Sequence, residues 1–101
     1  MVRVSILHSK QWIIDNRALH HMTPNFHTLT SVYKLDEPIY ITILDGRTVS
    51  MELAGTVNVA SGLILKNVLY TPNLTCNLIS AHKLVKDENC LVTYGANSCL
   101  I

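Results

Sequence analysis

The sequence predicts an all-β fold: a small closed or nearly closed β-barrel with one short helix near the C-terminus. Three observations support this prediction. Short runs rich in β-branched and aromatic residues, about five or six of them, follow one another at close spacing. Turn residues separate these runs, above all Asp45-Gly46 and Ala60-Ser61-Gly62. The chain has 101 residues, of which 49% are hydrophobic and 15% charged, so it can pack one core and has no room for a second domain.

The first expected strand covers residues 11–14 and is followed directly by a polar cluster. Asp15, Asn16 and Arg17 make up this cluster, which ends the apolar run. Residues 19–35 have no clean period for a helix or a strand, and Thr23-Pro24-Asn25 is typical of a turn. We therefore expect a loop with one helical turn between the first strand and the next.

A hairpin is expected where residues 38–44 run into Asp45-Gly46 and return through residues 48–53. The first arm is rich in β-branched residues and contains one aromatic residue, Tyr40, and such residues favour strands. Glycine readily adopts the positive φ that tight hairpin turns require. This hairpin is the clearest local signal in the sequence.

A second hairpin is expected to join residues 55–59 to residues 63–70 through Ala60-Ser61-Gly62. The first arm alternates apolar and polar side chains, as a half-buried strand does. Gly55 lies inside a longer run of strand-like residues, where a glycine typically marks a bulge or a bend. One long strand that turns a corner of the barrel would explain this position.

The C-terminal part is expected to leave the sheet and form a helix. Pro72 ends the strand before it, because proline cannot donate a backbone hydrogen bond. Ser80 is a typical N-cap for a helix over residues 81–88. Residues 90–94 and 98–101 then predict a last hairpin.

Composition and charge exclude several classes of protein. We treat residues 1–101 as one domain, with a core over about 11–101 and a short N-terminal extension over 1–10. No apolar run approaches the ~20 residues of a spanning helix, and no signal-peptide core is recognisable, so we expect no membrane partner and an intracellular, cytoplasmic location. The net charge is +1 and the basic residues are scattered, which argues against nucleic-acid binding by this domain alone.

No metal or cofactor site is expected from the cysteines and histidines. The three cysteines lack the paired spacing of a zinc site or a disulfide framework. His20 and His21 are adjacent, so they point to opposite sides of an extended chain. We expect the histidines to be solvent-exposed or hydrogen-bonded locally.

Several motifs resemble the protease segment of the Pol polyprotein of copia-type long-terminal-repeat retrotransposons. The signature of that family is a Trp and two apolar residues, then Asp-Ser-Gly-Ala and a nearby His-Met pair. Trp12, Asp15, Ala18 and His21-Met22 match it here. Residues 65–80, which read LKNVLYTPNLTCNLIS, are similar to a second, longer motif of the family. The resemblance extends from about residue 11 to residue 91.

The resemblance implies a retropepsin-like aspartic protease subunit with a β-barrel fold. In such enzymes each subunit of a homodimer supplies one aspartate, here Asp15, and the two carboxyl groups share a proton. One carboxylate activates a water and the other polarises the scissile carbonyl of a polypeptide substrate. The family uses no cofactor, and in it this activity processes a Gag-Pol precursor.

This chain departs from the signature at two positions. Asn16 stands where the family has a serine that locks the two active-site loops across the dimer, and Arg17 stands where it has glycine. Asn16 still provides hydrogen-bonding groups. Arg17 adds a long cation, loses the freedom of glycine, and would hold both carboxylates ionised. We therefore expect catalytic impairment and at best a weak homodimer.

Several other positions have both a structural and a functional interpretation. Without the resemblance, Asp15 would be a strand-end carboxylate in a turn. Asp45, Gly46 and Arg47 form a turn and, in an active enzyme, are a candidate for the flap over the substrate. The segment Leu78-Ile79-Ser80 either supports the active-site loop or packs in the core, and Trp12 anchors the core or a dimer interface.

Three functions therefore remain open. The first is an active homodimeric aspartic endopeptidase. The second, which Asn16 and Arg17 favour, is an aspartic-protease-like domain that folds but has lost activity. The third is a non-enzymatic binding module, for which the sequence lacks a basic patch interleaved with aromatic residues.

Overall fold

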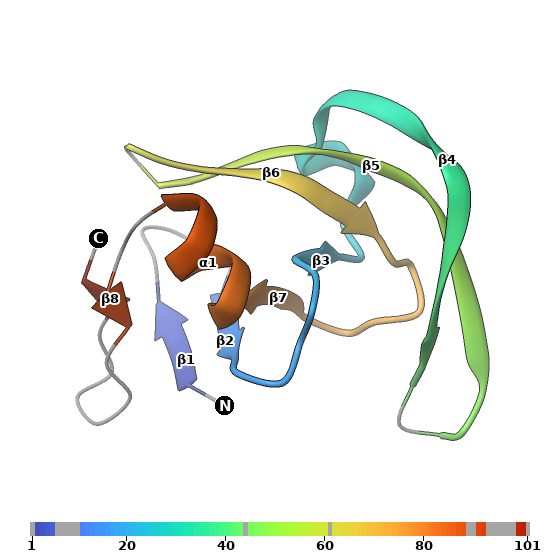
Figure 1. Cartoon of the computed structure of the whole chain (residues 1–101), viewed down its shortest axis with the longest axis horizontal. Coiled ribbons are helices and arrows are strands. Elements are labelled where there is room, and N and C mark those ends of the chain that lie inside the picture. The colour runs from blue at the N-terminus through green and yellow to red at the C-terminus, as the bar shows by residue number, and fades with distance from the viewer. Residues whose placement is uncertain are drawn as a thin grey trace.

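The computed structural model describes residues 2–5, 11–43, 45–60, 62–88, 91–92 and 99–100. Strands predominate in these ranges, and the one α-helix among them, α1 (Ala81–Glu88), follows the last strand of the main sheet (Figure 1). The mainly β class and the short helix near the C-terminus are confirmed. No helix in the described ranges has the length and apolar character needed to cross a bilayer.

The main sheet has seven strands in the order β1-β2-β7-β3-β6-β5-β4. Their bounds are Val2–Ser5 (β1), Gln11–Asp15 (β2), Met22–Thr23 (β3), Thr30–Thr42 (β4), Thr48–Ala60 (β5), Leu63–Tyr70 (β6) and Asn77–Ser80 (β7). A 3-10 helix, Phe26–Thr28, provides the expected helical turn before β4. β1, from the segment expected to be an extension, pairs antiparallel with β2.

The expected C-terminal hairpin forms a sheet of its own. β8 (Leu91–Val92) and β9 (Cys99–Leu100) pair antiparallel in a separate two-stranded sheet. The turn expected between them lies outside the described residues. Both strands are short, so this hairpin adds little to the main sheet.

The β4–β5 hairpin is confirmed but is much longer than the sequence predicts. At its tip the Ile43 amide donates to the Arg47 carbonyl at 2.9 Å, and the Gly46 amide donates to the Ile43 carbonyl at 2.9 Å. Gly46 has φ +91°, as expected for a glycine in this turn. β4 begins at Thr30, within the segment expected to be a loop. Its register against β5 is interrupted between Thr30 and Tyr33 and again between Lys34 and Ile39, which removes the regular alternation that predicts strands.

Gly55 marks an irregular point of β5, as expected. The register between β5 and β6 shifts between Gly55 and Val57, and Asn67 on β6 takes up the extra length with φ +57°. A Cβ atom on Gly55 would lie 2.8 Å from the Thr30 carbonyl oxygen and 3.3 Å from Leu29 Cβ. Glycine is therefore required here by the close approach of the chain at the start of β4.

The prediction of a closed or nearly closed barrel is wrong, because the sheet is open. β1 and β4 lie at opposite ends of the strand order and each pairs with one neighbour. Most residues of β4 are exposed, and it carries Pro38 and the charged pair Asp36-Glu37, which are features of an edge strand. Closing the sheet would require this interrupted edge to pair with β1. The long hairpin instead arches over one side of the sheet (Figure 1).

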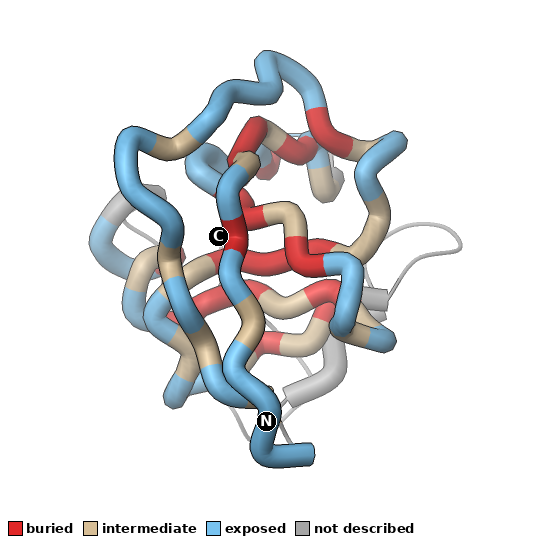
Figure 2. The backbone as a smooth tube through the Cα atoms, turned by 90° about the vertical axis from the view of Figure 1, so that its right-hand side faces the viewer, coloured by how far each residue is buried: buried red, intermediate tan, exposed pale blue. Residues whose placement is uncertain are grey.

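Two hydrophobic clusters lie on opposite faces of the sheet. Adjacent residues of a strand point to opposite faces, so Val68 packs in the first cluster and Leu69 in the second. The first cluster contains Trp12 and is covered by α1 through Leu84, which confirms Trp12 as a core residue. The second cluster lies under the β4–β5 hairpin. Figure 2 shows the buried segments in the middle of the molecule and mostly exposed or intermediate backbone on the hairpin side.

We expect Gly55→Ala to lower the free energy of unfolding by about 1–3 kcal/mol, because its methyl group would collide with the Thr30 carbonyl. Chemical denaturation of the purified domain measures this difference. Gly62→Asn is the matched control, since Gly62 has φ +81°, nothing lies within 4 Å of its Cβ position, and asparagine tolerates positive φ. Equal stability of Gly55→Ala and the unmodified domain would contradict the argument.

Candidate active site

Asp15 lies at the end of β2, as predicted, next to a strand from the far end of the sequence. β2 pairs in parallel with β7, and the register places Asp15 opposite Ser80. Trp12 and Ile14 are buried in the first cluster, at 4% and 0% exposure. Alternation along the strand therefore directs Asp15 to the opposite face, on the side of the second cluster.

The Asp15 carboxylate is held by the backbone that follows it. Its Oδ1 atom accepts a hydrogen bond from the Arg17 amide at 2.8 Å. Arg17 is an exposed residue. The ion pair found within the described ranges joins Arg47 to Asp45, and Arg17 forms none with Asp15 there. In a single chain, Arg17 therefore contacts Asp15 through its amide and not through its charge. The expected ionising contact would have to arise between two chains.

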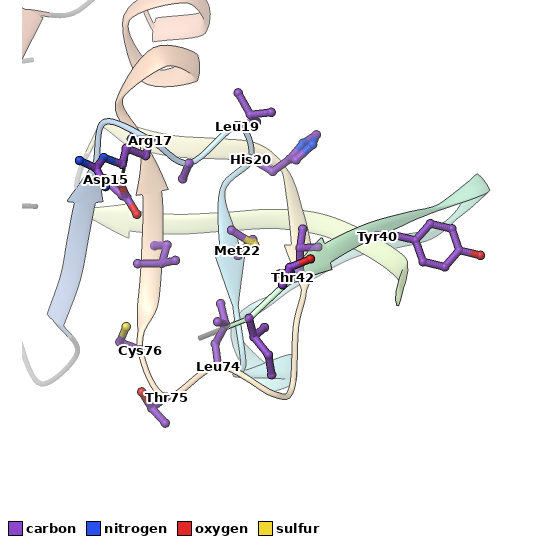
Figure 3. A pocket seen from close by; sticks show the side chains of 14 residues that line it. Asp15, Arg17, Leu19, His20, Met22, Tyr40, Thr42, Leu74, Thr75 and Cys76 are labelled. Atoms are coloured by element: carbon purple, nitrogen blue, oxygen red, sulfur yellow. Dashed lines mark hydrogen bonds between the residues drawn. The ribbon is translucent and has the colours of Figure 1, made fainter. Parts of the chain in front are cut away.

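A cavity of about 510 Å³ opens beside Asp15. Asp15 and Arg17 lie together at one end of it, and Leu74, Thr75 and Cys76 lie toward the other end (Figure 3). Much of the wall belongs to the second hydrophobic cluster. The shared residues are Ala18, Met22, Ile41, Leu74 and Leu78. The cavity is therefore largely apolar, with the Asp15 carboxylate at one end.

The end of the β4–β5 hairpin forms another part of the wall. Residues 40–43 line the cavity, whereas Asp45, Gly46 and Arg47 are exposed at the tip beyond it. The Arg47 amide donates to Asp45 Oδ1 at 2.9 Å, and Arg47 Nε donates to Asp45 Oδ2 at 2.6 Å. The first of these bonds is the main cause of the lowered pKa of Asp45. The flap remains a prediction, and the residues that would cover the cavity are 40–43.

Ser80 forms hydrogen bonds to the loop that follows Asp15, in line with one of the two roles expected for Leu78-Ile79-Ser80, but the part played by His21 was not predicted. The Ser80 amide donates to His21 Nδ1 at 3.0 Å, and Ser80 Oγ donates to the Ala18 carbonyl at 2.7 Å. Ser80 Oγ also accepts from the Lys83 amide at 3.2 Å, which confirms Ser80 as the N-cap of α1. The expectation for histidines is wrong for His21, which is 1% exposed and bonds a residue 59 positions away.

His20 has the opposite orientation and lines the cavity, as the alternation of adjacent residues predicts. Burial lowers its pKa from the usual 6.5, and the positive charge of Lys83 lowers it further.

Among the residues that the structure describes, no group of three or more His, Cys, Asp and Glu side chains could hold a metal ion. Asn16 is exposed and does not line the cavity, although its neighbours Asp15 and Arg17 do.

Comparison with known proteins places the chain in a family. Residues 12–90 match the family described as "Pol polyprotein, beta-barrel domain". The chain therefore belongs to the β-barrel domain family of Pol polyproteins, even though its own sheet is open at both edges. The matched range contains Asp15, the cavity and α1. No solved structure matches the chain significantly.

Two curated relatives come from plant transposons. The chain is 32% identical over 79 residues to "Retrovirus-related Pol polyprotein from transposon RE1" of Arabidopsis thaliana, which covers 75% of this chain and 5% of the relative. It is 29% identical over 89 residues to "Retrovirus-related Pol polyprotein from transposon RE2" of the same plant, which covers 85% of this chain and 6% of the relative. The chain thus spans only about a twentieth of the polyproteins it matches. The resemblance to retrotransposon Pol polyproteins is confirmed at this level.

We expect His20 to titrate below the usual pKa of 6.5, and Lys83→Gln to raise its pKa part of the way back. NMR titration of the imidazole signals measures both values. Because the folded-state pKa is the lower one, the unfolded chain binds the proton more readily. The stabilising contribution of neutral His20 is therefore fully present above the unfolded pKa and is lost as the pH falls from that value through the lower folded-state pKa.

Lys86→Gln is the control for this titration, since Lys86 lies on the same helix and does not contribute to the lowered pKa of His20. A His20 pKa above 6.5, or an equal response to both lysine variants, would contradict the assigned cause.

Proposed function

We propose that this chain is the aspartic-protease-like domain of a copia-type retrotransposon Pol polyprotein, and that its own peptidase activity is impaired. The observation that supports the first part is the position of Asp15, at a strand end, beside a second strand, and at one end of an apolar cavity. Family membership restricts the chain to Pol polyproteins and leaves the activity open.

The cavity suits a polypeptide substrate. Its wall is mainly apolar, and residues 40–43, at and just after the end of the edge strand β4, form one side of it. An edge strand offers backbone hydrogen-bonding groups to an extended peptide. A peptide lying in the cavity would pass Asp15 at one end. One chain supplies one carboxylate here, so the chemistry of a shared proton requires a second copy.

The proposed impairment rests on Asn16 and Arg17. A dimer that brings two Asp15 carboxyl groups together would also bring two Arg17 residues close to its axis. Two guanidinium groups repel each other there, and each favours an ionised carboxylate over the shared proton. Arg17 is exposed in the single chain, so a dimer would have to accommodate two copies of its side chain in the interface.

An active homodimeric endopeptidase is the alternative, because the Arg17 guanidinium makes no ion pair with Asp15 in the single chain and could turn away. A non-enzymatic binding module is the third function. Both alternatives share the same cavity, so only measurements of activity distinguish them.

The unmodified domain is expected to cleave neither a peptide library nor a Gag-Pol-like precursor between acidic and neutral pH. Asn16→Ser combined with Arg17→Gly should restore pepstatin-sensitive cleavage, because it removes the cation and returns the loop-locking hydroxyl. Mass spectrometry of the products measures both outcomes.

The control is Asp15→Ala in the restored variant, which should abolish cleavage. Cleavage by the unmodified domain that disappears in Asp15→Ala would establish the active alternative. Complete inactivity of the restored variant would remove Arg17 as the cause of impairment.

The isolated domain is expected to be monomeric or weakly dimeric, because two Arg17 side chains repel near the axis and the loop-locking hydroxyl is absent. Sedimentation velocity over a concentration series measures this equilibrium. Added salt should strengthen any dimer by screening the repulsion. A tight dimer at low micromolar concentration that is insensitive to salt would contradict the prediction.

A further inference from the structure

The loop that follows Asp15 is tied to the junction of β7 and α1. Ser80 makes both connections: its hydroxyl donates to the Ala18 carbonyl, and its amide donates to His21 Nδ1. Ser80 is 0% exposed and His21 is 1% exposed, so water does not compete for these groups. The loop is thus held by a part-buried bond at Ala18 and by a buried bond at His21.

Each of these bonds has a fixed direction. A serine hydroxyl has one hydrogen to donate, and here the Ala18 carbonyl receives it while the Lys83 amide occupies a lone pair of the same oxygen. His21 Nδ1 accepts from a backbone amide, so this nitrogen carries no proton. The imidazole is therefore neutral, with its proton on Nε2. An imidazolium ring could not accept this bond.

Arg17 lies between the end of β2 and the bonded Ala18 carbonyl. Its amide is the group that donates to Asp15 Oδ1 at 2.8 Å. Fixing Ala18 limits the movement of the neighbouring peptide, and so limits where the Arg17 amide can point. The orientation of the Asp15 carboxylate thus depends on hydrogen bonds made away from the carboxylate itself, at Ala18 and at His21.

We propose that His21 and Ser80 are positioning residues for Asp15. They hold the loop over residues 16–20 so that the Arg17 amide keeps the carboxylate in one orientation at the end of the cavity. The fixed orientation of the carboxylate is expected in the unmodified chain, whether or not that chain is active. Its meaning for catalysis rests on the proposed function, in which Asp15 is the catalytic group.

The first test is NMR spectroscopy of the unmodified full chain. The nitrogen shifts of His21 should show an unprotonated Nδ1 and a protonated Nε2. A protonated Nδ1 would overturn the proposal without any variant.

The second test compares solvent-exchange rates of the Arg17 amide in matched variants. His21→Leu removes the acceptor, whereas His21→Asn places a carbonyl oxygen near the position of Nδ1. We expect exchange to be about tenfold faster in His21→Leu and within about threefold of the unmodified rate in His21→Asn, as for the loss and retention of one hydrogen bond. Unchanged exchange of amides in β5 and β6 shows that the fold is intact.

Ser80→Ala and Ser80→Thr form a second matched pair, on which the same exchange measurement is made if the His21 variants do not fold. Ser80→Ala removes the hydroxyl and Ser80→Thr keeps it, so only the first should speed exchange at Arg17. Equal exchange at Arg17 in all folded variants would overturn the proposal.

A third test separates this proposal from the proposed function. In the restored variant, Asn16→Ser with Arg17→Gly, adding His21→Leu should lower kcat about tenfold with little change in KM, and adding His21→Asn should not. Changed exchange at Arg17 together with an inactive restored variant would support positioning and refute the proposal that Asn16 and Arg17 cause the impairment. Cleavage whose kcat is unaffected by His21→Leu would refute positioning and support the protease function.

Discussion

The parallel pairing of β2 with β7 is the constraint on which the rest of the molecule depends. It joins the first apolar run of the core to a strand that follows the long β-meander, and its register sets Asp15 opposite Ser80. Trp12, Ile14 and Ile79 then face the cluster covered by α1. Asp15 and Leu78 are left to the face where the cavity forms. The same pairing therefore separates the core from the candidate site.

The sequence predicted those features that have a local cause. Alternation and turn residues identified the β4–β5 and β5–β6 hairpins, and the Ser80 cap identified α1. β3 has two residues and β7 four, too few for a periodic pattern, and both exist because neighbouring strands pair with them. The open edge of β4 depends on contacts across the whole sheet, so composition and strand number alone suggested closure.

In the candidate site, too, residues with a local signal could be predicted and residues that depend on distant contacts could not. Asp15 was recognisable because a carboxylate ends an apolar run and a motif surrounds it. The motif also includes His21, but the buried role of this residue could not be predicted, since it depends on a residue 59 positions later. The cavity wall formed by residues 40–43 likewise depends on where the hairpin bends. In each case the missing information is long-range packing, which local patterns do not contain.

The separation in sequence between the Asp15 loop and Ser80 also affects how the chain folds. The bond from Ser80 to Ala18 spans 62 positions, so closing it carries a large loop entropy, and contacts of such separation slow folding. During synthesis, β4, β5 and β6 can form their meander before β7 exists. The pairing that holds Asp15 is completed only once residues 77–80 have emerged. A chain that stops short of them keeps the carboxylate and loses the strand beside it.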